Sequence, residues 1–325
     1  MSNRQSISSR FHQRAAIVLL CAAILLVCVE AGLRWRFGLG RPLLIYLDES
    51  YGYAYRPAQD LKRFGNRVYY NHEGLRSEEL QPIPGGVHER ILCVGDSITN
   101  GGTVIDQNET YPYILQRQLL KSGLRVQVLN ASAGGWAMEN ELNYLQAKGL
   151  YQSRIVILEI ASHDLYQKKS TKNDVADNPN FPTTPPLSAT SELLARYLLP
   201  RIVNYSKLFW REYSDPMTKA EYQECRSLLG RMVSLVRHQN AAAIVMLIPD
   251  RDEAISSSYK QDHISDLRSV CQLPSCRFIE ALDRFHGPIR SGAALYRDEV
   301  HPNQAGNQVM ANTALEALSA VSGIN

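Results

Sequence analysis

The chain has 325 residues, of which 45% are hydrophobic and 21% are charged, which suits one large globular domain with additions or two small domains. Lys and Arg number 35 against 32 acidic residues, and no basic run with interleaved aromatics occurs, so we expect no nucleic-acid partner. The sequence has no CxxC pair and no HExxH motif, so we expect neither a metal site nor a cofactor.

The first predicted element is an apolar helix near the N-terminus. Residues 15–29 read AAIVLLCAAILLVCV without a charge, and arginines flank them on both sides. As a helix this stretch covers about 22 Å, short of the roughly 30 Å hydrocarbon core, and extension to Leu33 includes Glu30 near the far end. We interpret residues 15–33 as an uncleaved transmembrane anchor and residues 1–14 as a cytoplasmic tail.

Two alternatives to an anchor stay open. A cleaved signal peptide is one, because Val29, Glu30 and Ala31 form a passable small-residue cleavage site. A lipoprotein is the other, although Val27 is large for the position before Cys28. The flanking basic charges nearly balance, so the positive-inside rule leaves the orientation open.

Residues 34–88 are rich in Tyr, Arg and Gly, and short alternating pieces such as residues 66–70 predict strands and turns. We interpret 34–88 as a membrane-proximal segment packed on the main domain. Pro and Gly residues at 82–86 mark its boundary.

From residue 89 onward, apolar runs of strand length alternate with helical periodicity. Near-continuous apolar strands separated by helices predict a parallel sheet covered on both faces, hence an α/β domain over residues 89–325. The predicted strands are residues 91–94, 126–129, 155–160, 243–248 and 278–279.

Residues 165–216 are too long for a simple connection and are predicted to be an insertion. They contain NPNFPTTPP, which suits neither a regular helix nor a central strand. The insertion forms either a lid or substrate wall, or an extra helix on the core. Farther along, Cys271 and Cys276 bracket a turn-prone stretch; they form either a local disulfide in an oxidising compartment or two unrelated thiols.

Polar residues follow the predicted strands, where parallel α/β sheets gather their ligands. They are GDS at 95–97, NASAGG at 130–135, ASHD at 161–164 and, before the last predicted helix, DEVH at 298–301. A serine hydroxyl needs a base to become a nucleophile, and His301 is the candidate base for Ser97. Asp298 could fix the tautomer of His301.

A tetrahedral intermediate also needs donors for its oxyanion. The candidates are the backbone amides of Ser97 and Gly135 and the ring of His163. Each motif alone has an ordinary structural reading: GDS is a common turn and helix cap, DxxHP is a common helix start, and a lone histidine is usually a satisfied polar residue. Their order and shared position at strand ends favour a catalytic site.

GDSIT (95–99), NASAGG (130–135), ASHD (161–164) and DEVHPNQAG (298–306) resemble the four signature blocks of the SGNH, or GDSL-type, hydrolases. The resemblance covers roughly residues 89–320. It implies a flavodoxin-like three-layer α/β/α sandwich that cleaves esters of lipids, acyl groups or glycans. It also implies that Ser97 is the nucleophile, His301 the general base and acid, and Asp298 its orienting partner.

The upstream stretches YGYAYRP and NHEGLRSEE, with the later TVIDQNETYPYILQRQL, resemble a bacterial subgroup with an N-terminal membrane helix. In that subgroup the hydrolase-like domain lies outside the cytoplasm. The resemblance therefore implies a single-pass protein of the cytoplasmic (inner) membrane, with its catalytic domain on the periplasmic or extracellular side.

The third block departs from the family pattern Gly-x-Asn-Asp, because His163 stands where the asparagine amide donates to the oxyanion. Histidine can donate too, but it is bulkier and titrates near neutrality.

Together, the motifs and the apolar helix lead us to expect a membrane-anchored serine esterase acting on an O-acyl or O-acetyl ester of a glycan or lipid. An acyltransferase that passes the acyl group to an extracellular glycan and a non-catalytic, degenerate hydrolase domain are the alternatives.

Overall fold

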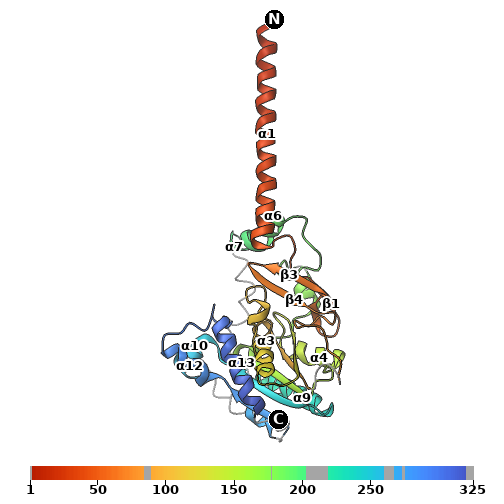
Figure 1. Cartoon of the computed structure of the whole chain (residues 1–325), viewed down its shortest axis with the longest axis vertical. Coiled ribbons are helices and arrows are strands. Elements are labelled where there is room, and N and C mark those ends of the chain that lie inside the picture. The colour runs from red at the N-terminus through yellow and green to blue at the C-terminus, as the bar shows by residue number, and fades with distance from the viewer. Residues whose placement is uncertain are drawn as a thin grey trace.

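The computed structural model describes residues 2–83, 89–176, 178–202, 219–259, 267–272 and 275–319. A single long helix, α1 (Ser2–Phe37), projects from a globular body that holds the rest of the described chain (Figure 1). Residues His12–Phe37 are long and apolar enough to be a membrane span or a signal sequence, and none of their most apolar stretch is buried. The helix runs past the predicted end of the apolar segment at Leu33.

Two small antiparallel hairpins follow α1. The first pairs β1 (Ile45–Asp48) with β2 (Gly52–Tyr55), and the second pairs β3 (Gln59–Arg63) with β4 (Asn66–Tyr70). Aromatic side chains anchor them on the body: Tyr51, Tyr53 and Tyr70 are at most 2% exposed and belong to the same apolar cluster as the central sheet. Strands and turns therefore occupy this segment, as its alternating pattern predicts.

The body is built on five parallel strands. They are β5 (Glu89–Gly95), β6 (Val126–Ser132), β7 (Ile155–Ala161), β8 (Ala242–Ile248) and β9 (Cys276–Glu280). Their spatial order is β6-β5-β7-β8-β9, which is the flavodoxin-like order 2-1-3-4-5. Each of the five predicted strands is confirmed, and each is one to three residues longer than its apolar run.

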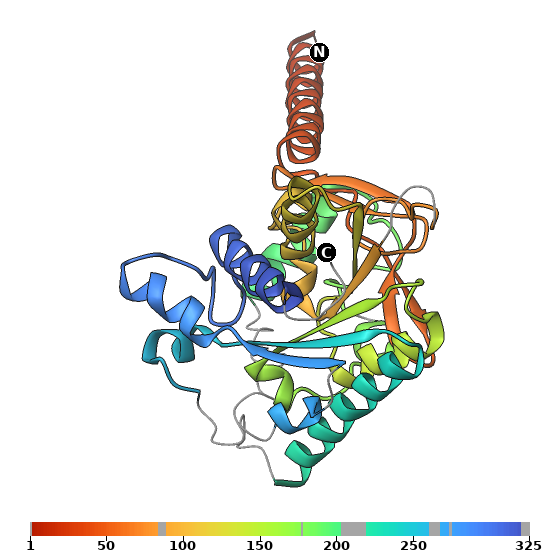
Figure 2. The same cartoon turned by 60° about the horizontal axis from the view of Figure 1, so that its bottom comes forward.

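Helices cover both faces of this sheet, because alternate strand residues point to opposite sides. Leu92 and Val94 pack toward α4 (Met138–Lys148) and α9 (Lys219–His238), whereas Ile91 and Cys93 face the other way. That second face is covered by α3 (Tyr111–Lys121), α12 (Leu282–Arg290) and α13 (Gln304–Ser319). Figure 2 shows the sheet between these layers. The three-layer α/β/α fold is confirmed.

The connections carry short helical segments. Those near the strand ends are α2 (Ser97–Asn100), η1 (Gln107–Glu109), η2 (Ser162–Tyr166), α10 (Arg251–Ser256) and η5 (Ser269–Cys271). The predicted insertion carries α5 (Lys172–Ala176), α6 (Ala189–Glu192), the π-helical turn η3 (Leu193–Leu198) and α7 (Leu199–Ile202). Its residues 203–216 lie outside the described residues. Cys271 and Cys276 are joined in a disulfide.

Candidate active site

The turn between β5 and α2 puts Ser97 at the start of a helix. Asp96 caps α2 by accepting a hydrogen bond from the Ile98 amide at 2.7 Å. Gly95 has no room for a side chain, because an added Cβ would lie 2.3 Å from Thr99 Oγ1 and 2.7 Å from Glu159 Oε2. The apolar strand therefore ends in a glycine because no side chain fits there, and Asp96, the next residue, is the N-cap of α2.

Ser97, His301 and Asp298 meet although 204 positions of sequence separate the serine from the histidine. His301 Nε2 lies 3.0 Å from Ser97 Oγ, and His301 Nδ1 lies 2.9 Å from both carboxylate oxygens of Asp298. With Nδ1–H donating to Asp298, Nε2 is an acceptor for the serine hydroxyl, and Asp96 Oδ2, also at 3.0 Å, is another. This is the geometry of a serine nucleophile with an oriented base.

Asp298 is held in its charged form. Burial would raise its pKa, but hydrogen bonds from the His301 ring and from the amides of His301 and Val300 outweigh that effect and hold the pKa well below its usual value. An ionised Asp298 favours the imidazolium that forms when His301 takes a proton.

A glycine loop after β6 lies beside the nucleophile. A Cβ added at Gly134 would lie 3.9 Å from the Cβ of Ser97. Tyr53 donates its hydroxyl to the Gly134 carbonyl at 2.5 Å, and Ser170 donates to the Gly135 carbonyl at 2.6 Å. Gly135 has φ +81°, where side chains are rare. The first hairpin and the insertion thus both fix the loop that carries the candidate oxyanion amide.

His163 lies next to Asp96 and is 6% exposed. Its Nδ1 is 2.9 Å from Asp250 Oδ1, and its Nε2 is 3.5 Å from Asp96 Oδ2. Burial would lower the pKa of His163, but the carboxylates of Asp164, Asp250 and Asp96 outweigh burial and raise the pKa well above its usual value. The structure thus places the His163 ring next to Asp96, which in turn accepts a hydrogen bond from Ser97 Oγ at 3.0 Å.

Further acids surround this histidine. Burial and the neighbouring charges of Asp96 and Asp164 raise the pKa of Glu159 well above its usual value. Burial and Asp96 raise the pKa of Asp164 to about 8. Asp96 itself keeps a lowered pKa: burial opposes ionisation, but the hydrogen bond and charge of His163 outweigh it.

Atoms of Asp96, His163 and Asp164 lie within 4.8 Å of one another, a spacing that could hold a cation. The ring nitrogen of His163 that faces the two acids lies 3.5 Å from Asp96 and 3.8 Å from Asp164, which are distances of an ion-pair network.

Sequence reasoning missed Asp250, Glu159 and Tyr53. Asp250 directly follows β8 and its Pro249, so the rule that polar residues gather after parallel strands could have found it. Glu159 lies within a strand that otherwise reads as apolar, and one charged residue in such a run was a usable signal. Nothing in the sequence near Tyr53 indicates that it contacts Gly134.

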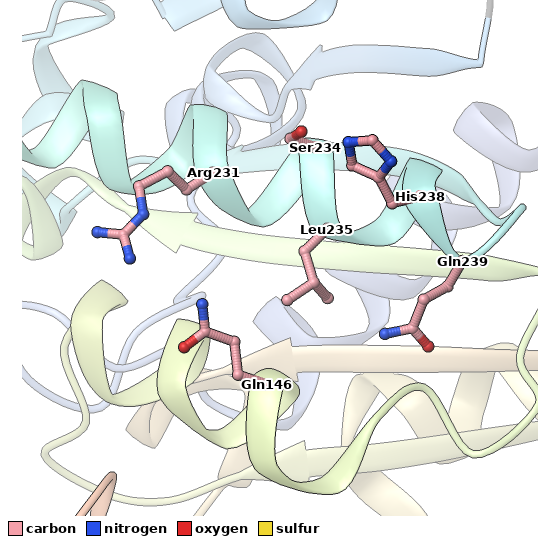
Figure 3. A pocket seen from close by; sticks show the side chains of 6 residues that line it. All are labelled: Gln146, Arg231, Ser234, Leu235, His238 and Gln239. Carbon is pink, nitrogen blue, oxygen red and sulfur yellow. The ribbon is translucent and has the colours of Figure 1, made fainter.

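A hollow of about 390 Å³ lies elsewhere on the described part of the chain. It is a shallow hollow between α4 and α9, lined by Gln146, Arg231, Ser234, Leu235, His238 and Gln239 (Figure 3). None of these residues belongs to the cluster around Ser97, so this hollow takes no part in the candidate site.

Residues 93–309 match the model of the GDSL-like Lipase/Acylhydrolase family, whereas no curated protein matches the chain. Among solved structures, the chain is similar to LAE5, an alpha/beta hydrolase enzyme from the metagenome of Lake Arreo, Spain. The identity is 17%, the TM-score is 0.49, and the match covers 73% of this chain and 98% of LAE5.

Two further structures are similar to the chain. One is a member of the lipolytic protein G-D-S-L family from Veillonella parvula, with 15% identity, a TM-score of 0.44, and coverage of 71% of this chain and 98% of that one. The other is the psychrotrophic esterase EstA from Pseudoalteromonas sp., with 15% identity, a TM-score of 0.43, and coverage of 71% and 97%. Because the family model spans well over half of the sequence, the chain belongs to the GDSL-like Lipase/Acylhydrolase family.

Proposed function

We propose that this protein is a serine ester hydrolase that works through an acyl-serine intermediate. The observation that carries the proposal is the 3.0 Å approach of His301 Nε2 to Ser97 Oγ, with Asp298 on the other ring nitrogen. His301 takes the hydroxyl proton as Ser97 Oγ attacks the ester carbonyl carbon, and then gives that proton to the departing alcohol. Water, deprotonated by His301, then attacks the acyl carbonyl carbon; the bond from that carbon to Ser97 Oγ breaks, Ser97 Oγ takes the proton from His301, and the acid is released.

The oxyanion of each tetrahedral intermediate needs donors that are already in place. We assign this role to the Ser97 amide at the start of α2, the Gly135 amide and a ring N–H of His163. The Gly135 assignment is supported by its neighbour Gly134, where an added Cβ would lie 3.9 Å from the Cβ of Ser97. The ring N–H in question is the one on Nε2, because Nδ1 lies 2.9 Å from Asp250, whereas Nε2 lies 3.5 Å from Asp96, which is longer than an ordinary N–H···O hydrogen bond.

We place the domain outside the cytoplasm, held at the inner membrane by α1. The apolar helix supports the anchor, and the Cys271–Cys276 disulfide supports an oxidising compartment. Mass measurement of the protein from the membrane fraction tests the anchor: an intact N-terminus is expected, whereas a mature chain that begins at Gly32 would show a cleaved signal peptide.

The substrate that we propose is an O-acyl or O-acetyl ester of a glycan or lipid, as the resemblance to SGNH hydrolases implies. Ser97→Ala should lower kcat/KM on p-nitrophenyl acetate by at least about 10³-fold, because the nucleophile is lost. Ser291 is exposed and is not one of the candidate site residues. Ser291→Ala is therefore the control and should keep full activity. Equal activity of the two variants would end the hydrolase proposal, and transfer to an added sugar in place of acid release would favour the acyltransferase.

A further inference from the structure

The end of α1 is joined to the predicted insertion by Glu30. Its carboxylate accepts hydrogen bonds from the amides of Ala189 and Thr190 at 2.8 and 2.9 Å, and from the Thr190 hydroxyl at 2.9 Å. Arg34, one turn farther along α1, donates to the same carboxylate at 2.7 Å. The acid that interrupts the apolar segment therefore has a structural role: it fixes α6 beside the anchor helix.

A second connection is buried at the same place. Glu192, the last residue of α6, is 2% exposed. It accepts hydrogen bonds from the Gly40 amide at 2.6 Å, from Arg63 on β3 at 2.5 Å and from Arg196 at 3.0 Å. Arg63 also donates to the carbonyl of Gly38 at 2.6 Å. Removing one partner of such a buried pair is costly, so residues 187–202 are held firmly at the end of α1.

Figure 1 shows where this places the segment: α6 and α7 lie at the end of α1, on the side of the body from which the helix projects. Residues 187–202 also carry leucines whose side chains are exposed. The exposed apolar side chains here, with their exposed fractions, are Leu187 (100%), Leu194 (46%), Leu198 (39%), Leu199 (51%) and, on α1, Trp35 (88%). Large apolar side chains left exposed in short segments that lie together indicate an interaction site.

Arginines outnumber acids beside these leucines, although Arg34 pairs with Glu30 and Arg196 pairs with Glu192. The arginines of residues 34–41 and 187–202 are Arg34, Arg36, Arg41, Arg196 and Arg201, and the only acid in those two ranges is the buried Glu192. Apolar side chains beside arginines fit a bilayer interface, where leucines enter the acyl boundary and guanidinium groups meet anionic headgroups. An exposed tryptophan next to an apolar helix fits the same level.

We propose that residues 187–202, together with Trp35, form a second membrane contact, seated in the interface of the bilayer that α1 crosses. The proposal rests on the proposed anchor. A bilayer is favoured over a protein partner because the surface is continuous with α1: the hydrogen bonds of Glu30 and Glu192 leave the leucines at the level where the apolar helix ends. Two contacts fix the orientation of the domain, which a single helix with a free linker would not do.

Spin labels on the full-length chain test this surface. In a Cys21→Ala and Cys28→Ala background, the other two free cysteines are buried, so single cysteines can be labelled at chosen sites. Leu199→Cys probes the surface, and Ile255→Cys on α10 is the matched control, since the native residues are 51% and 52% exposed. Leu25→Cys reports on the anchor.

The protein is placed in vesicles of phosphatidylethanolamine and phosphatidylglycerol, and each label is relaxed by oxygen, which enters lipid, or by a water-soluble nickel chelate. Oxygen should dominate at Leu25 and Leu199, and nickel at Ile255. A Leu199 label that behaves like Ile255 while Leu25 is in lipid would overturn the surface and leave the anchor intact. A Leu25 label in water would overturn both, and labelling of Ser97 by an active-site probe would still test the hydrolase separately.

Discussion

His163 is an imidazole at the position where the SGNH motif has an asparagine amide. The ring lies between Asp250 on Nδ1 and Asp96 on Nε2, and the carboxylates around it outweigh burial and raise its pKa. The Nε2–H that we assign to the oxyanion also faces Asp96, which lies 3.0 Å from Ser97 Oγ. Substitution at this one position therefore affects both the oxyanion and the residue next to the nucleophile.

We expect His163→Ala to lower kcat by about 10²–10³-fold, the usual cost of one oxyanion donor, with a smaller effect on KM. His163→Asn should keep substantially more activity, because an amide restores a donor. Both variants remove the ring that faces the Asp250 carboxylate. Each is therefore also made together with Asp250→Asn, and the double variant is compared with the single variant. Wild-type kcat in His163→Ala, at matched Tm, would mean that the amides of Ser97 and Gly135 act without the ring.

At the scale of elements, the β5–α2 turn shows what the sequence could and could not predict. The apolar run predicts the strand, and the end of that run correctly indicates the rim of a parallel sheet. The contacts of Gly95 with Thr99 and Glu159 could not be predicted, because Glu159 lies on another strand and its direction depends on tertiary packing. The same holds for Tyr53, which reaches the glycine loop from a hairpin 81 positions away.

Gly95→Ala should destabilise the fold by about 1–3 kcal/mol, the usual cost of overpacking, because the new methyl would lie 2.3 Å from Thr99 Oγ1. Activity should fall as well, since Ser97 is only two residues away. Gly230→Ala is the control: this glycine lies in α9 with no atom within 4 Å of an added Cβ, and alanine there should raise stability by about 0.5–1 kcal/mol. Thermal unfolding of both variants measures the contrast, and equal shifts in Tm would contradict the close packing at Gly95.

At the scale of the whole molecule, the buried cluster makes stability depend on pH. The pKa values of His163, Glu159 and Asp164 are all raised on folding, so the folded state holds more protons than the unfolded state above about pH 4–5. For His163, the contribution is complete below the unfolded pKa and disappears as pH rises through the folded pKa. For the two acids, the folded state loses stability as pH rises toward their raised values.

The free energy of unfolding should therefore fall as pH rises from 5 to 9, by about 1.4 kcal/mol per pH unit for each extra proton bound. Glu159→Gln should make this slope shallower, because a neutral amide replaces a group that the fold keeps protonated and can still accept from Thr99. Glu73→Gln, at an exposed carboxyl, controls for net charge. Denaturation in detergent at several pH values gives the slopes. A free energy of unfolding that rises with pH would contradict the raised pKa values of His163, Glu159 and Asp164.

The fold as a whole was the easier part to predict from the sequence. Five apolar runs with helices between them specify a parallel three-layer sandwich, and strand ends specify where Ser97, Gly135 and His301 gather. The buried polar network around His163 and the attachment of α6 to Glu30 could not be predicted. Both depend on single side chains that are far apart in the sequence and meet only in the fold. Hydrophobic periodicity does not predict which of them pair.

The central claim is that Ser97 is the nucleophile activated by His301, and a fluorophosphonate probe tests it most directly. The full-length protein is labelled, digested and mapped by mass spectrometry, with Ser97→Ala and the exposed Ser291→Ala in parallel. The 3.0 Å contact between His301 Nε2 and Ser97 Oγ predicts one phosphonate adduct, on the peptide that contains Ser97, in wild type and Ser291→Ala only. Labelling that persists unchanged in Ser97→Ala, or an adduct on another serine, would contradict the account.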